Sequence, residues 1–410
     1  MRALPAPRRV VVTGLGVVAP HGLVGVDAFW RGLLAPQVEG RERTVGGDDG
    51  GATSGVERWL ERREAKRLDA FAQYAVAAAG EALTDAGLAG GLSDLGGGTS
   101  YDPHRAAVVI GTGMGGLPAY EASVQARLER GERRVSPFTI PMTMANSPAG
   151  AVSLRWGWRG PCECVATACA AGAHSIAAAA RLVAFGTADV ALAGGAEGCV
   201  VPTAVAGFAN MTALSKTGVS RPFDVQRDGF CIGEGAGVLV LEPLETALAR
   251  GATPWMEVLG AASSADAHHV TAPPPEGVGA TACMRAALAD AELDASEVVH
   301  VNAHGTSTPL NDAAEATGVA TLLGAARPAV TSVKGVTGHT LGAAGAVEAV
   351  AVALSMRHRT IPPTAGTTEV DPALDVDVVL EPRAWEPGPT LSNSFGFGGH
   401  NGTLVLGPVA

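Results

Sequence analysis

A regular alternation of two kinds of segment constrains the fold of this chain most strongly. Short apolar runs end in glycine-rich turns, as in RRVVVTGLG (8–16), RAAVVIGTGMGG (105–116) and ADVALAGGAEG (188–198). Alanine-rich stretches of helical length lie between such runs, for example at 68–87 and 341–357. Continuous apolar runs are typical of strands buried on both faces. Their alternation with helices predicts an α/β fold with buried sheets.

The same rhythm returns after about residue 250. Apolar runs end in polar or glycine-rich turns at WMEVLGAASS (255–264), VVHVNAHGTS (298–307), AVTSVKGVTGH (329–339) and TLSNSFGFGG (390–399). Two halves of similar rhythm indicate a duplicated unit, although no repeat of fixed period is visible. We expect the halves to pack as one body. The predicted loops are 38–55, 90–102 and 271–277, which are rich in glycine, proline or charge.

Composition excludes several functions. A hydrophobic content of 47% over 410 residues predicts a globular chain with a large core. The net charge of −11 argues against nucleic-acid binding, which requires a basic face. There is no uninterrupted apolar run long enough for a membrane span, no secretory signal pattern at the start and no paired cysteine framework. The sequence therefore predicts a cytoplasmic protein with reduced thiols.

Glycines near strand ends raise the alternative of a dinucleotide site. Gly14 and Gly16 follow a predicted strand, but no third glycine stands at the G-x-G-x-x-G spacing and no acidic partner follows. GTGMGG (111–116) also follows a strand, and it is equally well explained as a turn with close backbone packing. The pair Cys162 and Cys164 has no second pair at metal-ligand spacing. Neither a nucleotide nor a metal site is predicted.

One cysteine stands at a predicted helix start. Cys169 lies in TACAAGAH, directly before the helical stretch IAAAARLVAF. The partial positive charge at the start of a helix lowers the pKa of a thiol, so the sequence predicts a nucleophilic thiolate here. A cysteine taken alone is more often a small buried residue.

Two histidines follow predicted strands in the second half. His304 comes after VVHVNA, and His339 follows AVTSVKGVTG at the mouth of a helix. Each histidine alone is more often structural than catalytic. Together with Cys169 they form a nucleophile and two imidazoles at three strand ends, a set that predicts an active site.

These stretches carry a family resemblance. TACAAGAH, NAHGTSTP, SVKGVTGH with LGAAGAVE, and NSFGFGGHNG resemble the signature stretches of the β-ketoacyl-[acyl carrier protein] synthases, condensing enzymes of the thiolase superfamily. The resemblance covers nearly the whole chain. It implies an acyltransferase with the five-layered αβαβα thiolase-like fold, divided into a half that carries the cysteine (1–250) and a half that carries both histidines (251–410). It also implies a homodimer, or a heterodimer with a chain-length-factor subunit, and no cofactor or metal.

The resemblance assigns the reacting groups residue by residue. Cys169 matches the acyl-accepting nucleophile, and its backbone N–H together with that of Phe397 matches the oxyanion hole. His304 and His339 match the paired histidines that stabilise the enolate formed when a malonyl thioester loses carbon dioxide. Lys334, one of only three lysines in the chain, matches the lysine that orders this network.

The resemblance also assigns supporting and binding roles. The expected structural residues are Glu348, which pairs with Lys334, and Asp312 and Glu315, which order a loop. The expected phosphopantetheine contacts are Thr306, Thr308 and, more weakly, Thr271. The expected gate and acyl-pocket residues are Phe395, Phe397 and Met114, although Met114 is equally well explained as a core filler.

Acyl carrier proteins are acidic, so an acidic enzyme must present a local basic surface to bind one. The resemblance locates this surface on two arginine-rich segments, for which ordinary solvated helix faces are the alternative interpretation. The predicted docking residues are Arg62, Arg63, Lys66, Arg67, Arg130, Arg133 and Arg134.

Three functional hypotheses follow. The first is an elongating ketosynthase of fatty-acid or type II polyketide synthesis. The short, glycine-rich segment between Leu34 and Arg62 slightly favours a polyketide pathway, and a reducing, polyene-like one fits better because aromatic ketosynthases carry different flanks around the histidine and C-terminal glycine motifs. The second is a chain-length-factor-like subunit that does not condense, against which the retained Cys169 argues. The third is a papain-like cysteine hydrolase that uses Cys169, His304 and Asn302, which leaves Lys334 and His339 unexplained.

Overall fold

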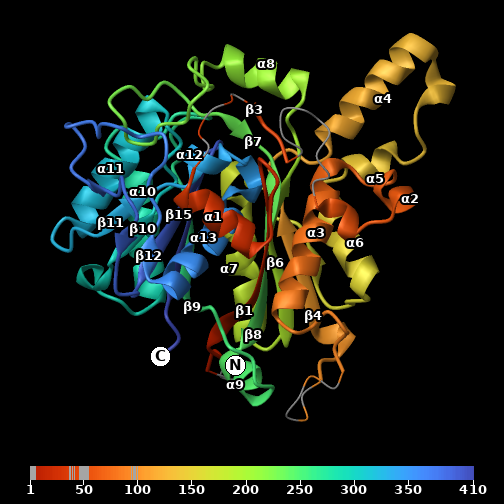
Figure 1. Ribbon diagram of the computed structural model, residues 1–410, viewed down its shortest axis with the longest axis horizontal. Helices are drawn as coiled ribbons and strands as arrows, with labels where there is room; N and C mark the ends of the chain where they lie inside the picture. The colour runs from red at the N-terminus through yellow and green to blue at the C-terminus, as the bar shows by residue number, and fades with distance from the viewer. Residues whose placement is uncertain are drawn as a thin grey trace.

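A single path of strands connects the two halves of the molecule. The computed structural model describes residues 6–36, 38, 40, 42–45, 55–93, 95, 98 and 100–410. The strand order is β13-β11-β10-β15-β16-β9-β1-β8-β6-β4-β5, with β2 paired to β1 (Figure 1). The strands of the first half are β1 (Val10–Ala19), β2 (Leu23–Val24), β4 (Ala106–Gly111), β5 (Cys162–Glu163), β6 (Val190–Glu197) and β8 (Gly235–Pro243). Those of the second half are β9 (Met256–Ala265), β10 (His300–Asn302), β11 (Ala329–Thr331), β13 (Asp377–Val378), β15 (Thr390–Gly396) and β16 (His400–Gly407).

Helices cover both faces of each half-sheet and produce five layers. α3 (Ala70–Asp85) and α6 (Ser147–Trp156) cover the outer face of the first half, and α10 (Val278–Asp290) and α11 (Pro309–Leu323) cover that of the second. α7 (Ala171–Ala184) and α13 (Ala344–His358) lie between the two half-sheets and contact each other. Figure 1 shows these layers from α11 on the left to α3 on the right. The αβαβα fold predicted from the sequence is confirmed.

The composition of the middle layer explains how two sheets fit around it. α13 is buried along 344–356, so that it has no solvent face over this length. Its residues there are mostly alanine, glycine and valine, and α7 is similarly rich in alanine. Small side chains let helix and strand backbones approach closely at native packing density. The largest apolar core of the described residues accordingly combines α7, α13 and the inner faces of β1, β6 and β8.

The N-terminal strand joins the two halves. β1 pairs antiparallel with β8 along most of its length, and its first residues pair with β9 through Val10↔Val258, Val11↔Glu257 and Val12↔Met256. The predicted boundary between 250 and 251 falls in the turn between α9 (Leu244–Ala249) and β9. The halves therefore share a strand path and a helical layer and form one body.

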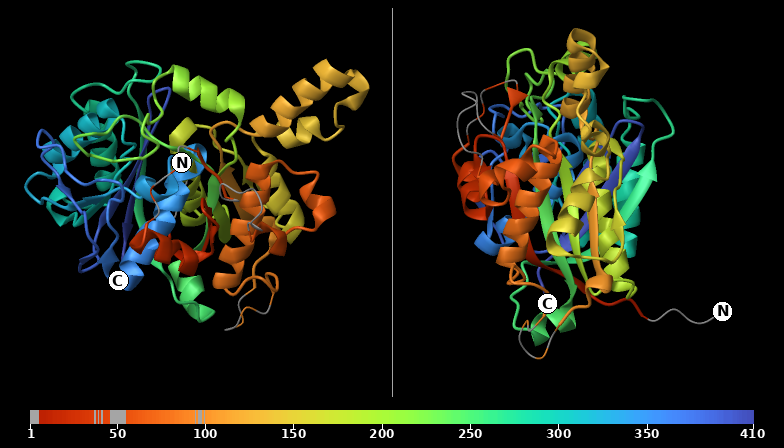
Figure 2. Two further views of the ribbon diagram at one scale, coloured as in Figure 1. Left: turned by 45° about the horizontal axis from the view of Figure 1, so that its top comes forward. Right: turned by 90° about the vertical axis from the view of Figure 1, so that its right-hand side faces the viewer.

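Shorter elements decorate this framework. Figure 2 shows α4 and α5 projecting from the main body. The remaining helices are α1 (Val26–Leu34), α2 (Arg62–Ala65), α4 (Leu117–Arg130), α5 (Thr139–Thr143), α8 (Pro202–Asn210) and α12 (Lys334–Thr337). The 3-10 turns are η1 (Val56–Arg58), η2 (Pro103–Arg105), η3 (Glu132–Arg134), η4 (Ala168–Ala170), η5 (Ala295–Glu297) and η6 (Leu341–Ala343). Within the described ranges, no helix has the length and apolar character needed to cross a membrane.

The segment 38–55, predicted to be a loop, contains a short strand. Glu42 and Arg43 form a short strand, β3, which pairs in parallel with β7 (Ile232–Gly233). Residues 39, 41 and 46–54 of this segment lie outside the described residues, as do 94, 96, 97 and 99 of the predicted loop at 90–102. A further two-stranded sheet joins β12 (Thr360–Ile361) to β14 (Arg383–Ala384).

Candidate active site

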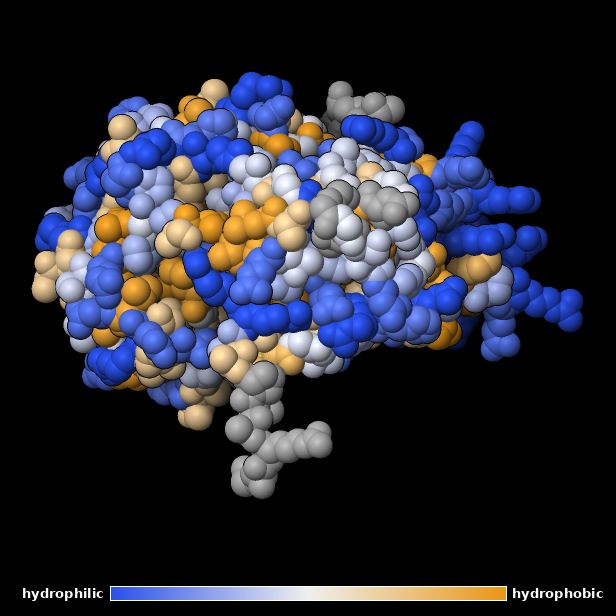
Figure 3. Space-filling view, turned by 90° about the horizontal axis from the view of Figure 1, so that it is seen from below, coloured by the Kyte–Doolittle hydropathy of each residue, from blue (hydrophilic) through white to orange (hydrophobic). Residues whose placement is uncertain are grey.

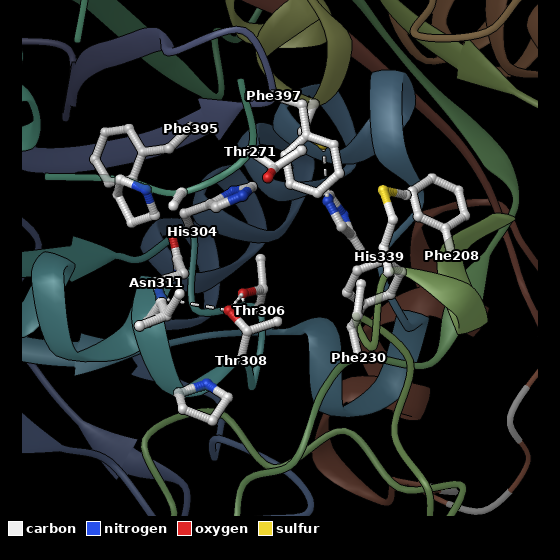
Figure 4. Close-up of a pocket in the computed structure, with 18 of the residues that line it drawn as sticks. Phe208, Phe230, Thr271, His304, Thr306, Thr308, Asn311, His339, Phe395 and Phe397 are labelled. Atoms are coloured by element: carbon white, nitrogen blue, oxygen red, sulfur yellow. Dashed lines mark hydrogen bonds between the residues drawn. The ribbon is translucent and has the colours of Figure 1, made fainter. Parts of the chain in front are cut away.

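Residues from both halves of the chain line one cavity of about 560 Å³. Cys169 comes from the turn before α7, and His304 and His339 follow strands β10 and β11 of the second half. Phe395 comes from the end of β15, and Phe397 directly follows the strand. Figure 4 shows the two imidazole rings pointing into the cavity, with the phenyl ring of Phe397 beside them. The structure thus brings the predicted nucleophile and both predicted histidines together.

Cys169 stands in a strained turn. The turn η4 precedes α7, so the sulfur lies at a helix start as the sequence predicted. The preceding residue, Ala168, has φ +50°, in the left-handed region that residues other than glycine rarely adopt. Such strain is found where the surrounding structure forces a functional side chain into position. The Cys169 residue is 7% exposed.

The predicted thiolate is not what burial favours. Burial raises the pKa of the Cys169 thiol to about 12, although the Lys334 charge and the backbone N–H of Phe397 act to lower it. Desolvation opposes the charged form more than the helix start favours it. The expectation of a lowered pKa is therefore wrong, because burial favours the neutral thiol.

His339 is placed to take the thiol proton. Its Nε2 lies 3.0 Å from the Cys169 sulfur. Its backbone is fixed on both sides, because its N–H donates to the Cys231 carbonyl at 2.7 Å and its carbonyl accepts from the N–H of Gly233 at 2.9 Å. Burial and the Lys334 charge hold the pKa of the imidazole well below its usual value. A neutral imidazole can accept a proton that an imidazolium cannot.

The position of Lys334 determines the tautomer of His304. The Lys334 ammonium donates to the His304 carbonyl at 2.5 Å and lies 3.4 Å from His304 Nδ1. An ammonium has no acceptor, so Nδ1 must be the accepting nitrogen and the ring proton sits on Nε2. Burial and the nearby Lys334 charge hold the pKa of His304 well below its usual value. His304 is thus a neutral donor through Nε2.

Buried carboxylates hold this arrangement from behind. Glu348 forms an ion pair with Lys334. Glu315 accepts the backbone N–H groups of His304 and Gly305, each at 2.8 Å. Asp312 accepts the backbone N–H of Phe223 at 2.8 Å, and also that of Ser307. Burial raises the pKa of Glu315 to about 7 and that of Asp312 to about 6. The two carboxylates order the loop that carries His304.

Backbone N–H groups also lie close to the Cys169 sulfur. The N–H groups of Phe397 and Cys169 both lie close enough to the sulfur to lower its pKa. This approach requires a glycine at 396, since a Cβ there would meet the Thr167 carbonyl oxygen at 2.7 Å and the Cys169 nitrogen at 3.1 Å. The result is a sulfur with imidazoles on one side and two backbone donors on the other, the set required for acyl transfer with charge stabilisation.

Comparison with known proteins decides the family. Residues 48–247 match the model of the β-ketoacyl synthase N-terminal domain, and residues 255–368 match that of the C-terminal domain. The chain belongs to the β-ketoacyl synthase family. It is 43% identical to 3-oxoacyl-[acyl-carrier-protein] synthase 2 of Synechocystis over 97% of this chain and 98% of the relative. It is 40% identical to the enzyme of that name from Staphylococcus aureus strain N315, with the same coverage.

Solved structures agree with this membership. The ishigamide ketosynthase/chain length factor superposes with a TM-score of 0.88 and 34% identity, over 99% of this chain and 100% of that one. A type II polyketide ketosynthase, solved with its acyl-carrier protein and a bound hexaketide, superposes with a TM-score of 0.87 and 30% identity. The match covers 98% of this chain and 100% of that one. The family fold therefore extends over the whole β-ketoacyl synthase chain described here.

The three threonines predicted to contact phosphopantetheine all line the cavity of this β-ketoacyl synthase (Figure 4). The hydroxyls of Thr306 and Thr308 lie 2.9 Å apart. Thr308 also caps α11 by accepting the backbone N–H of Asn311 at 3.3 Å. Thr271 belongs to a loop whose neighbour Val270 accepts the N–H of Gly398 at 2.7 Å. The loop that carries Thr271 and the segment that carries Phe395 and Phe397 are therefore in direct contact.

Other predicted residues of this synthase lie away from the cavity. Met114 does not line it and is 45% exposed, because the turn continues through Gly115 with φ +71° and directs residue 114 outward. A place in the acyl pocket is not supported for Met114 in the single chain. The docking residues are all exposed, on α2, on η3, at the end of α4 or next to these elements.

The sequence did not reveal several residues of the site. Phe208 of α8 and Phe230 line the cavity, and the Phe230 ring packs edge-on against His339 with centroids 5.1 Å apart. Glu197, fully buried at the end of β6, accepts the backbone N–H groups of Gly113 and Gly342 at 2.7 and 3.0 Å. An acidic residue at the end of a buried strand was the one signal available, and the two phenylalanines carried none.

The alternative chemistries find less support in this synthase. Asn302, the third member of the hydrolase hypothesis, is buried and donates to the Ser392 hydroxyl at 3.1 Å. It does not line the cavity. Among the described residues, no group of three or more histidine, cysteine or acidic side chains could hold a metal ion.

Proposed function

We propose that the protein is a β-ketoacyl-[acyl-carrier-protein] synthase that joins an acyl chain held on Cys169 to a malonyl unit delivered by an acyl carrier protein. One observation carries the proposal above the others. A buried sulfur lies 3.0 Å from one neutral imidazole, while a second neutral imidazole and two backbone donors face the same cavity.

The first step is acyl transfer. The Cys169 sulfur attacks the carbonyl carbon of the carrier-bound thioester as its proton passes to His339 Nε2. The N–H groups of Cys169 and Phe397 hold the negative oxygen of the tetrahedral intermediate. When the carbon–sulfur bond to the carrier arm breaks, the departing thiolate takes the proton from His339. The enzyme is left acylated and the imidazole neutral.

The second step is decarboxylative condensation. The malonyl carboxylate leaves as carbon dioxide, and its electron pair moves into an enolate at the thioester. The N–H on Nε2 of His304 stabilises this oxygen where its charge develops, and His339 adds a second N–H once its ring proton stands on Nε2 instead of Nδ1. The enolate carbon then attacks the acyl carbonyl on Cys169, the carbon–sulfur bond breaks, and the departing cysteine thiolate takes up a proton from water. The enolate itself needs no proton, because its electron pair forms the new carbon–carbon bond.

Two competing functions are weaker. A chain-length-factor-like subunit needs neither a nucleophile nor an ordered histidine pair, and both are present here. A cysteine hydrolase needs water at the acyl-enzyme, whereas apolar Phe208, Phe230 and Phe397 surround the sulfur. The observations therefore favour condensation.

We propose that the carrier protein docks on α2, the end of α4 and η3. Arg62, Arg63, Lys66 and Arg67 lie exposed on and just after α2, and Arg130, Arg133 and Arg134 lie exposed near the end of α4. Hydrophilic side chains project at the end of the molecule that carries these helices (Figure 3). In a chain of net charge −11, such a cluster offers a local attraction for an acidic carrier.

A second copy, or a related subunit, is proposed to cover the edge of the sheet. β5 ends the strand path and both of its residues are exposed. Ile140 of α5 and Leu154 of α6 are large exposed apolar side chains on the same side. An open edge flanked by apolar side chains is a typical protein-protein contact. Light scattering of the purified protein measures its assembly state.

The substrate range and setting remain predictions. The curated relatives are named 3-oxoacyl-[acyl-carrier-protein] synthase 2, and the solved neighbours include a type II polyketide ketosynthase. We propose elongation in one of these two pathways, in the cytoplasm and without a cofactor, because the proposed steps use only side chains, backbone donors and the carrier-bound substrates.

The decisive experiment combines a carrier panel with one variant. The purified protein is incubated with acyl carrier proteins loaded with acyl chains of different length and with malonyl, and the products are weighed intact by mass spectrometry. Extension by two carbons is expected for a preferred range of chains. The Cys169→Ala protein should still release carbon dioxide from the malonyl carrier but form no extended product. Condensation by this variant would refute the function.

A further inference from the structure

A charged side chain lies buried directly behind the catalytic turn. Arg43 of β3 is 0% exposed and is the largest fully buried side chain among the described residues. Within that part of the chain it forms no ion pair with a carboxylate. Burial lowers the pKa of the guanidinium, while the neighbouring Cys231 side chain acts to raise it. Burying a guanidinium is costly unless its N–H groups are hydrogen-bonded, so its acceptors matter to the structure around it.

The acceptors of Arg43 identify that structure. Its Nη1 donates to the carbonyls of Gly335 and Val336 at 2.5 and 2.7 Å. Both carbonyls belong to α12, and the last carbonyls of a helix find no N–H donor within the helix. A cation at the end of a helix satisfies these groups and their partial negative charge. Its Nη2 donates to the Val38 carbonyl at 2.7 Å, and its Nε donates to the Gly40 carbonyl at 3.3 Å.

The helix that Arg43 caps, α12, connects Lys334 to the catalytic His339. α12 begins at Lys334, which contacts His304, and the chain reaches His339 two residues after the helix ends. Between them, Gly338 turns with φ +64°, and a Cβ at this position would meet the Cys231 carbonyl oxygen at 2.7 Å and Arg43 Cδ at 3.2 Å. The arginine stem therefore packs against the turn that aims His339 at the sulfur.

We propose that Arg43 is a positioning residue for the condensation reaction: its guanidinium fixes the Lys334–His339 turn from behind and so sets the distance from His339 to Cys169. The inference rests on the proposed function. Arg43 does not line the cavity and is enclosed, so it acts on the chemical step and not on carrier binding. A small displacement of a catalytic imidazole is sufficient to slow a reaction by a large factor.

The test compares Arg43→Met and Arg43→Lys with the wild-type protein. Condensation is measured with acyl and malonyl carrier proteins, and each rate is divided by the fraction of Cys169 that becomes acylated, determined by intact mass. We expect Arg43→Met to lower kcat per acylated site at least about tenfold while the apparent KM for the malonyl carrier changes by less than about twofold. Arg43→Lys keeps the charge but lacks the planar fork, so its kcat should lie between the two.

The matched control is Arg250→Met. The Arg250 side chain is 5% exposed and pairs with Glu242, and the residue does not line the cavity. Its loss should lower thermal stability and leave kcat per acylated site unchanged. An Arg43→Met protein that behaves like this control overturns the inference. If neither Arg43 variant is soluble while Arg250→Met is, Arg43 is a folding residue and the inference is likewise overturned. If the wild-type protein forms no extended product, the proposed function fails instead.

Discussion

The two walls of the cavity are built in opposite ways. The histidine wall consists of His304, Lys334, His339 and Glu348, all buried. An ion pair and a hydrogen bond join Lys334 to Glu348 and His304, and the His339 ring packs edge-on against that of His304. The phenylalanine wall is the segment 395–399, in which Gly398 and Gly399 have φ +87° and +75°. Its described contacts with its surroundings are mostly backbone hydrogen bonds and ring packing.

This difference corresponds to two tasks. Donors that stabilise a developing charge must be fixed in advance, since reorganisation during the reaction would cost the rate that they supply. An acyl chain and a carrier arm must nevertheless enter the cavity, which requires a segment that can move. The sulfur of Cys169 lies between the two walls and needs both.

The largest expected effect comes from breaking the histidine wall. His304→Ala removes one donor to the enolate and should lower malonyl decarboxylation by roughly 10²–10³-fold. Acylation of Cys169 should persist, because His339 and the backbone donors remain. Carbon dioxide release and intact mass measure the two steps. His358→Ala, at an exposed ring stacked on Trp30, is the control. Equal loss of both steps would show that the wall does not act as described.

The sulfur itself should respond to pH as a buried thiol. Because burial raises the pKa of Cys169 to about 12, the thiolate fraction stays small at neutral pH. Alkylation of Cys169 by iodoacetamide should therefore rise by about tenfold per pH unit between pH 7 and 9, following the thiolate fraction. Peptide mapping separates Cys169 from the exposed Cys162. A plateau below pH 8 would contradict the desolvated environment.

A smaller effect is expected at the phenylalanine wall. Gly396→Ala places a methyl group against the Thr167 carbonyl and the Cys169 nitrogen, so the Phe397 N–H must withdraw from the sulfur. Loss of part of one oxyanion donor should slow acylation by about tenfold. Decarboxylation should change less, which rapid-quench measurements of both steps test. Gly150→Ala is the matched control, because nothing lies within 4 Å of its added Cβ. Unchanged acylation would separate this wall from the oxyanion site.

The smallest effect is expected outside both walls. Arg67→Glu reverses a charge whose guanidinium lies over the Phe138 ring, 5.2 Å from its centroid, on the proposed docking face. It should raise the apparent KM for a carrier-bound substrate by about fivefold, with little change for a free thioester mimic. Arg285→Glu, exposed on α10, is the control. Equal effects of the two substitutions would remove the docking assignment.

The sequence predicted the layers of the fold and the reacting groups well. Apolar runs and alanine-rich stretches predicted the strands and the inner helices, because full burial leaves a strong compositional pattern. Cys169, His304 and His339 could be found because each follows or precedes a predicted element as a lone chemically active side chain. The family resemblance then assigned their partners Lys334 and Glu348.

Other features depend on contacts that no local pattern records. The raised pKa of Cys169 follows from burial in a site that Phe208 and Phe230 help to enclose from distant segments, whereas the sequence argument considered only the helix start. The resemblance gave Met114 a place at the acyl pocket, whereas the turn through the left-handed Gly115 leaves it 45% exposed. Arg43 stands in no motif, and its importance appears only when β3 is seen behind α12.

The pairing of β1 with both β8 and β9 limits how this enzyme could be recombined. A chimera that takes 1–250 from one synthase and the rest from another must match Val10, Val11 and Val12 to a foreign β9 at the seam. It must also fit a foreign α13 against α7. Exchange of the exposed α2 and α4 segments leaves this seam untouched, so the proposed docking surface is easier to transplant than either half of the catalytic machinery.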